Sequence, residues 1–221
     1  MNLSLKTNKN KAIALILLVI SMLLIKNPLT KFPITFCVVI VFILISTFLQ
    51  DKNLSSLNFK KLGFKEFKQI IISYLVFELV MDFIIQPIIS LIFNEPADYS
   101  TFKSIEGNSA LYIKWLFNMW ISAAIGEELL FRGFVFSQLQ RIIGNQKTII
   151  IILSAVVFSL PHLYQGISGL VVTFIFGIAF AIIYTKYRNI WINIIVHGLI
   201  DTLFLTLSYL GYIDFYNLLN K

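Results

Sequence analysis

Ionisable residues within the apolar stretches of this 221-residue chain are few, and they gather in three segments. The first segment holds Glu127, Glu128 and Arg132, the second runs from Phe158 to His162, and the third holds His197 and Asp201. Charged groups are costly in hydrocarbon, so each of them is expected to serve the function of the protein. Carboxyl and imidazole groups transfer protons near neutral pH, and together they favour hydrolytic chemistry.

Helical spacing separates the roles of the two adjacent glutamates. Residues four positions apart share a helix face, so Glu128 is predicted to pair with Arg132. Glu127 points in another direction and has no cation on its own helix, which suits a general base. Alternatively, the Glu128 and Arg132 pair serves only to hold the helix.

Both histidines of the chain lie in the other two segments. His197 and Asp201 stand one helical turn apart, so the carboxylate can orient the imidazole or act beside it. His162 follows Pro161, where a helix is disturbed. Three polar elements on three helices can converge on one buried cavity. There Glu127 and His162 would hold and deprotonate a water, and His197 with Asp201 would bind the resulting oxyanion. The simpler alternative is that each histidine makes an interhelical hydrogen bond.

These segments resemble the CPBP family of intramembrane proteases, which comprises type II CAAX prenyl endopeptidases and bacteriocin-processing proteins and is also called Abi. Its motifs are Glu-Glu-x-x-x-Arg, Phe-x-x-x-His and His-x-x-x-Asn/Asp, and all three are complete and in order between residues 111 and 207. The resemblance implies an endopeptidase in which Glu127 and His162 activate water and His197 and Asp201 bind the oxyanion. It also implies that Glu128 and Arg132 support these groups, whereas Phe158 packs around them.

One departure from the family bears on the substrate. Prenyl-processing members carry Asn where this chain carries Asp201, which argues against prenylated CAAX substrates. An ionised Asp201 would repel an oxyanion, so it must be protonated or serve mainly to orient His197. The expected substrate is a peptide or a membrane-associated protein. The resemblance also implies links to bacteriocin maturation and self-immunity, so a non-catalytic membrane protein that binds a peptide toxin is the alternative function.

No cofactor is expected for this mechanism, although zinc is an alternative. Two histidines and a carboxylate form a ligand set that zinc accepts with a water in the open position, and here the set would be Glu127, His162 and His197. The His-Glu-x-x-His motif of many zinc proteases is absent.

Two further nucleophiles are less favoured. The segment Gly166-Ile167-Ser168-Gly169 matches a short motif of rhomboid serine proteases, but their histidine lies two helices further on, whereas His197 is on the very next helix. Cys37 is the single cysteine and lies in an apolar run, so it supports no disulfide or thiolate site.

The composition predicts the elements that must position these groups. The chain is 58% hydrophobic and 13% charged, with a mean hydropathy of +0.85, which is typical of proteins buried in a bilayer. Apolar runs close to the length that crosses a bilayer predict an all-α, polytopic integral membrane helical bundle of about seven transmembrane helices. The predicted spans are Ala12–Ile25, Phe32–Leu49, Gln69–Phe93, Leu111–Phe136, Thr148–Pro161, Leu170–Tyr184 and Ile190–Leu207.

These spans suggest three regions. Residues 1–110 form N-terminal spans with a basic interfacial linker at 51–68, residues 111–207 form the catalytic core, and residues 208–221 form a short tail. The first span follows a lysine-rich start, as in a signal peptide, but lacks a small-residue cleavage site and is interpreted as an uncleaved anchor. The linker interleaves phenylalanine and leucine with lysine, which suits anionic lipid headgroups.

Two more acidic residues lie in the third predicted span. Glu78 and Asp82 stand one turn apart without a nearby cation in the sequence. They either line the path of the substrate or lie closer to a membrane interface than the predicted span suggests.

Charge distribution predicts the topology. Lysine and arginine concentrate in the N-terminal tail, at 52–68, at 141–147 and at 186–188, whereas 94–107 is mainly acidic. The positive-inside rule therefore places the N-terminus in the cytoplasm, with Lys26 and Lys31 as exceptions. This topology accounts for the net charge of +7, so no nucleic-acid partner is expected. Frequent Lys, Asn and Ile suit an AT-rich bacterium and hence a bacterial plasma membrane.

Overall fold

The structure is a computed structural model that describes residues 2–95, 98–213 and 215, with side chains described from residue 8 onward. The described residues form helices and connecting loops without a β-strand. The elements are α1 (Asn2–Ile25), α2 (Ile34–Asp51), the 3-10 helix η1 (Ser55–Leu57), α3 (Phe64–Val80), the π-helix η2 (Met81–Ile85), α4 (Gln86–Phe93), the 3-10 helix η3 (Ser100–Ile105), α5 (Ser109–Met119), the π-helix η4 (Trp120–Val135), α6 (Phe136–Ile143), α7 (Lys147–Ser159), the 3-10 helix η5 (Leu160–Gln165), α8 (Gly166–Tyr187) and α9 (Ile190–Tyr209).

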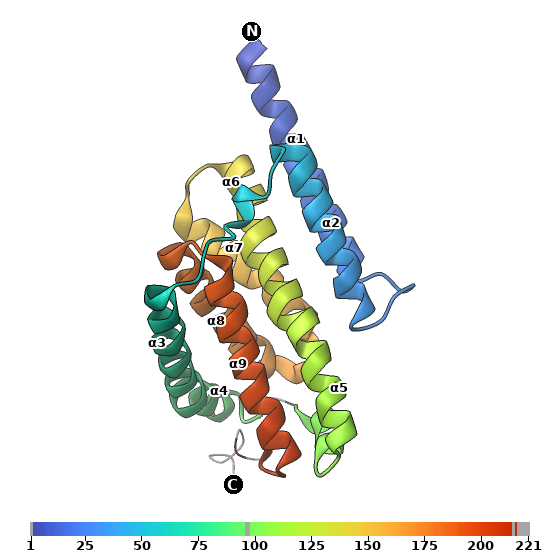
Figure 1. Cartoon of the computed structure of the whole chain (residues 1–221), viewed down its shortest axis with the longest axis vertical. Helices are drawn as coiled ribbons and strands as arrows, with labels where there is room; N and C mark the ends of the chain where they lie inside the picture. Colours follow the sequence, from blue (N-terminus) through green and yellow to red (C-terminus); the bar gives the residue numbers. More distant parts are fainter. Residues whose placement is uncertain (1, 96–97, 214, 216–221) are drawn as a thin grey trace.

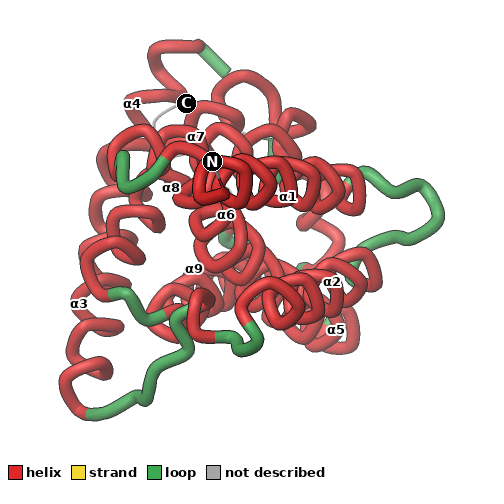
Figure 2. The backbone as a smooth tube through the Cα atoms, turned by 90° about the horizontal axis from the view of Figure 1, so that it is seen from above, coloured by secondary structure: helices red, strands yellow, loops and turns green. Residues whose placement is uncertain are grey.

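Seven long helical rods build the bundle, and most of them run along its long axis (Figure 1). Two of the rods are composite, because α3 continues through η2 into α4 and α5 continues through η4 into α6. Viewed along the long axis, α3 lies on one side of the bundle and α2 with α5 on the other (Figure 2). The predicted all-helical bundle of about seven helices is confirmed.

Five helical stretches are long and apolar enough to cross a membrane: Asn8–Ile25, Ile34–Asp51, Phe64–Phe93, Lys147–Tyr187 and Ile190–Tyr209. The fourth stretch contains both α7 and α8, which pack against each other and were predicted as separate spans. The rod of α5, η4 and α6 is not among the five. It carries the acidic and basic residues of the first motif, of which Glu128 and Arg132 are buried inside the bundle.

The linker and the fourth span have other limits in the structure than the sequence predicted. The linker was expected to reach residue 68, but α3 already begins at Phe64, since the Glu66 side chain accepts a hydrogen bond from the Gly63 N–H at 3.0 Å and caps the helix start. The fourth span was expected at 111–136, but its rod runs from 109 to 143. The Asn108 side chain caps its start, and Gly144, with φ 74°, ends it.

Glycines allow two close helix contacts that position the polar segments. A Cβ atom on Gly177 of α8 would lie 2.9 Å from the Ala155 Cα atom of α7. A Cβ atom on Gly198 of α9 would lie 2.5 Å from the Trp120 ring of η4. Since real Cβ atoms do not approach other atoms this closely, larger residues would push α7 from α8 and η4 from α9.

Candidate active site

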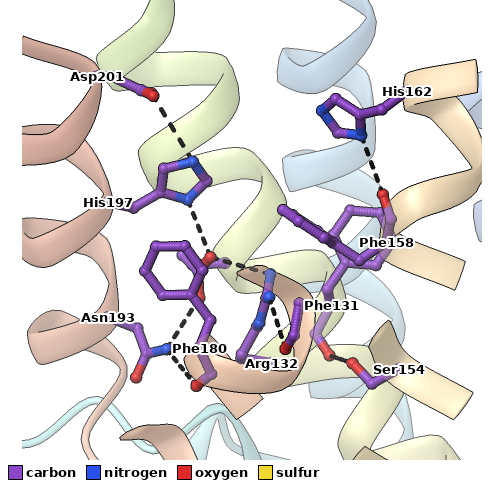
Figure 3. Close-up of polar contacts among 11 residues, drawn as sticks. Phe131, Arg132, Ser154, Phe158, His162, Phe180, Asn193, His197 and Asp201 are labelled. Atoms are coloured by element: carbon purple, nitrogen blue, oxygen red, sulfur yellow. Dashed lines mark hydrogen bonds and ion pairs between the residues drawn. The ribbon is translucent and has the colours of Figure 1, made fainter. Parts of the chain in front are cut away.

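Glu128 of η4 is the centre of a buried polar network (Figure 3). Its Oε1 atom accepts a hydrogen bond from Arg132 Nη1 at 3.0 Å and lies 3.0 Å from His197 Nδ1. Its Oε2 atom accepts a hydrogen bond from Asn193 Nδ2 at 3.1 Å. The carboxylate therefore ties η4 to α9 inside the bundle, where charge-assisted hydrogen bonds are strong.

Arg132 is fully buried and is held from several sides. Besides its bond to Glu128, its Nη2 donates to the Gly177 carbonyl of α8 at 3.3 Å. Its guanidinium lies over the Phe158 ring at 4.2 Å and over the Phe180 ring at 5.1 Å from the ring centres. A buried ion pair is retained only when further contacts satisfy it, and these contacts from α7 and α8 supply them.

His197 is oriented by Glu128 rather than by Asp201. A carboxylate oxygen can only accept, so Nδ1 of His197 carries the proton in its contact with Glu128. The imidazole also stacks on Phe180, with ring centres 4.8 Å apart. On its other side, Nε2 lies 3.8 Å from Asp201 Oδ2, which is beyond hydrogen-bonding distance. Asp201 therefore lies beside His197 as an ion-pair partner of its protonated form, and the hydrogen bond that orients the imidazole is made with Glu128.

Glu127 is half-buried and makes no hydrogen bond or ion pair with the residues that the structure describes. It lies close enough to His197 and Asp201 to interact with both electrostatically. Its neighbour Glu128 has its carboxylate committed to three partners. The unpartnered carboxyl of Glu127 therefore lies beside a fixed network and is free to exchange a proton with a bound molecule.

His162 projects from η5, the 3-10 turn that follows α7 and contains Pro161. The Phe158 carbonyl accepts a hydrogen bond from His162 Nδ1 at 3.1 Å, which leaves Nε2 for another partner. The Phe158 ring lies next to both histidines, with ring centres 5.4 Å from His162 and 6.5 Å from His197. Glu127 and His162 make no hydrogen bond with each other.

The acidic pair of α3 and η2 lies beside this site. Gln86 Nε2 donates to Asp82 Oδ1 at 2.7 Å, and Tyr99 donates to Gln86 Oε1 at 3.0 Å. Glu78 interacts electrostatically with Asp201, and its buried Oε1 atom has no hydrogen-bond partner among the described residues. These contacts place Glu78 on the side of α3 that faces the site.

The sequence did not lead to Asn193 as a member of the network, and it indicated only part of the role of Glu128. Asn193 bridges Glu128 and the Phe180 carbonyl, to which it donates at 2.9 Å. It stands four residues before His197, so the helical spacing that linked His197 with Asp201 could have found it. Glu128 was expected only to support other groups through Arg132. Nothing in the sequence signals its contact with His197, which lies 69 residues away.

The alternative nucleophile and ligand sets are not assembled within the described part of the chain. No three His, Cys, Asp or Glu side chains there are grouped as metal ligands, so Glu127, His162 and His197 do not form a zinc set in this arrangement. Ser168 is buried in the first turn of α8 and does not bond to His197. Cys37 is exposed and forms no disulfide within the described part of the chain.

Comparison with known proteins matched the segment that holds the three motifs. Residues 109–203 match the family described as type II CAAX prenyl endopeptidase Rce1-like. Searches of curated proteins and of solved structures gave no match. The matched segment begins with α5 and ends within α9, so it contains η4, η5 and every residue of the three motifs. As the motifs predicted, residues 109–203 of this multi-pass membrane protein match the Rce1-like family of type II CAAX prenyl endopeptidases, and such a match indicates a protease.

Proposed function

We propose that this protein is an intramembrane endopeptidase of the glutamate type, which hydrolyses a peptide bond in a peptide or a membrane-associated protein. One observation carries the proposal: the carboxyl of Glu127 is unpartnered and lies beside the pair of Glu128 and His197, whose positions are fixed. A carboxyl so placed can act as a general base for water without a metal or a serine nucleophile.

In the proposed mechanism, a water lies between Glu127 and Nε2 of His162. Glu127 takes one proton from this water while the water oxygen attacks the carbonyl carbon of the scissile bond. The carbonyl oxygen becomes an oxyanion, to which Nε2 of His197 donates when the imidazole carries both protons. Glu127 then passes its proton to the leaving amine as the carbon–nitrogen bond breaks. The products are a carboxylic acid and an amine, so the proton balance closes.

Asp201 and Glu128 have different tasks in this mechanism. Glu128 holds His197 through Nδ1 and stabilises the imidazolium form by its negative charge. Asp201 lies near Nε2, where an ionised carboxylate would repel the oxyanion, so the reaction requires its protonated form. We infer that substrates lack a prenyl group, and that the biological role is maturation of a bacteriocin or peptide toxin, or self-immunity.

We also infer the orientation in a bacterial plasma membrane. The predicted cytoplasmic segments 52–68, 141–147 and 186–188 lie where α2, α6 and α8 end, and these helix ends are at the end of the bundle that holds α6 (Figure 1). The 3-10 helix η3, which belongs to the acidic segment, lies at the opposite end. This arrangement supports a cytoplasmic N-terminus.

The test is peptidase activity of the purified full chain in lipid with a quenched fluorescent peptide library. Glu127→Gln should reduce cleavage by about 10²-fold or more, since it removes the proton acceptor. Glu106→Gln makes the same substitution at an exposed position before α5 and should leave activity unchanged. Activity that persists with a chelator supports the glutamate mechanism, whereas loss with a chelator overturns it in favour of zinc.

The same experiment separates catalysis from toxin binding. If the wild type cleaves no peptide, and Glu127→Gln still protects cells from a peptide toxin, the protein is a binder and the protease proposal fails. If the Glu127→Gln variant loses both cleavage and protection, the result supports an immunity role that depends on proteolysis.

A further inference from the structure

A polar pocket of about 360 Å³ lies against α6, outside the candidate active site. Three separate segments contribute to its lining: η1, α6 and the turn between α8 and α9. Its lining includes Ser55, Ser56, Asn58, Ser137, Arg141 and Arg188. No acidic residue lines it, so the pocket combines two guanidinium groups with hydroxyl and amide groups.

The two arginines leave hydrogen-bond donors without acceptors. Arg141 Nη2 donates to Asp51 Oδ1 at 2.5 Å, but its Nε atom is buried and has no partner among the described residues. Arg188 lies 5.9 Å over the Tyr184 ring and forms no ion pair within the described part of the chain. A buried N–H group without an acceptor is costly, so a ligand that supplies acceptor oxygens would stabilise this arrangement.

A buried hydroxyl adds to these donors. The Oγ atom of Ser56 is buried and has no hydrogen-bond partner among the described residues. Guanidinium groups present parallel N–H groups that match the oxygens of a phosphate, and hydroxyl groups complete such sites. The chemistry that fits the pocket is therefore a tetrahedral oxyanion with several acceptor oxygens.

The walls of the pocket are fixed before any ligand binds. Asn58 Nδ2 donates to the Tyr184 hydroxyl at 2.7 Å, and the Ile190 N–H donates to the Asn58 carbonyl at 3.1 Å. The Arg188 N–H donates to the Tyr184 carbonyl at 2.8 Å, which holds Arg188 in the left-handed conformation, with φ 52°. These bonds join η1 to α8 and α9, so little ordering is needed on binding.

The position of the pocket indicates the source of the phosphate. It lies where α2 ends at Asp51 and α8 ends at Tyr187, which is the level of the lipid headgroups if these helices span the hydrocarbon. The chain that leaves η1 towards α3 carries Lys60 and Lys61, and the start of α3 exposes the side chains of Phe64 and Phe67. Basic pockets between membrane helices at this level bind anionic headgroups. We propose that this pocket binds the phosphate group of an anionic phospholipid.

The test uses the purified full chain in neutral detergent micelles with added phosphatidylglycerol, phosphatidylcholine or inorganic phosphate. Lipid binding is measured by native mass spectrometry, and the melting temperature is measured in parallel. Phosphatidylglycerol should bind and raise the melting temperature more than phosphatidylcholine. Arg188→Gln should weaken phosphatidylglycerol binding by about tenfold or more, because it removes charge-assisted hydrogen bonds.

A matched control and a second variant keep the test decisive. Lys147→Gln removes a positive charge at the same end of the bundle but outside the pocket lining, and it should bind phosphatidylglycerol as the wild type does. Ser56→Ala removes only the buried hydroxyl and should weaken binding less than Arg188→Gln does. It serves as the test variant if Arg188→Gln does not fold.

Three results would overturn the proposal. Equal binding of phosphatidylglycerol to the wild type and the pocket variants would show that the pocket does not hold the lipid. Equal weakening by Lys147→Gln would show that diffuse surface charge attracts it. A melting-temperature rise with inorganic phosphate that depends on Arg188, without a rise with either lipid, would assign the pocket to free phosphate.

Discussion

Nδ1 of His197 and Oε1 of Glu128 lie 3.0 Å apart, and this contact joins the last helix of the bundle to the π-helix η4. The same oxygen accepts a hydrogen bond from Arg132 at 3.0 Å. The carboxylate thus balances a guanidinium and an imidazole at once. Because π-helical segments are rare and occur mostly at functional sites, the placement of Glu128 in η4 agrees with a site of action in this region.

Glu128→Gln should lower kcat with little change in KM. The amide keeps the shape of the side chain but lacks the negative charge that stabilises the imidazolium form of His197 in the proposed mechanism. By analogy with carboxylates that orient a catalytic histidine, the loss should be about 10²- to 10⁴-fold. Steady-state kinetics in lipid would measure it. An unchanged kcat in a folded variant would show that Glu128 has a purely structural role.

Arg132→Leu should destabilise the protein by about 3–5 kcal/mol, since it leaves the buried Glu128 carboxylate without its guanidinium. Arg132→Lys keeps the charge but cannot reproduce the two bonds to Glu128 and the Gly177 carbonyl, so its cost should be smaller. Unfolding in mixed micelles with increasing denaturant gives both free energies. Equal stability of Arg132→Leu and the wild type would contradict this account of the network.

Asp201→Asn should keep activity within about tenfold of the wild type, because Oδ2 of Asp201 lies 3.8 Å from His197 Nε2 and makes no hydrogen bond to it. If the reaction requires protonated Asp201, wild-type activity falls as rising pH ionises this carboxyl. Asparagine cannot ionise, so Asp201→Asn should not show the fall in activity that ionisation of Asp201 causes in the wild type. The measurement is kcat/KM against pH for both proteins. Abolished activity in the variant would instead show that the carboxyl itself takes part.

Gly177→Ala should destabilise the protein by about 1–3 kcal/mol, because the new methyl group would overlap the backbone of α7 at Ala155. It should also lower activity, since Gly177 accepts the hydrogen bond from Arg132. Gly63→Ala is the control: its Cβ atom would meet only the Glu66 side chain, at 3.2 Å. Melting temperatures in detergent would compare the two variants. Equal effects would show that the close approach of α7 and α8 is not needed.

Much of the fold follows from the sequence, because the apolar runs of a membrane protein are long and nearly uncharged. The predicted spans Phe32–Leu49 and Ile190–Leu207 differ from α2 and α9 by at most two residues at each end. The predicted helix ends that differ from the structure in the next two cases are ends that local capping interactions determine. Glu66 starts α3 within the predicted linker, and Gly144 ends α6 seven residues after the predicted end of its span. Hydropathy does not register such local hydrogen bonds.

The sequence by itself determined the helical membrane class, the three motifs and the pairing of Glu128 with Arg132, since residues four apart share one helix face. The tertiary structure decided which groups meet between helices. It placed His197 within hydrogen-bonding distance of Glu128 rather than of Asp201. It also brought Asn193 into the network and left Glu127 without a partner among the described residues. The physical reason is that these contacts depend on how closely helices approach at positions such as Gly177 and Gly198, and no local pattern encodes that distance.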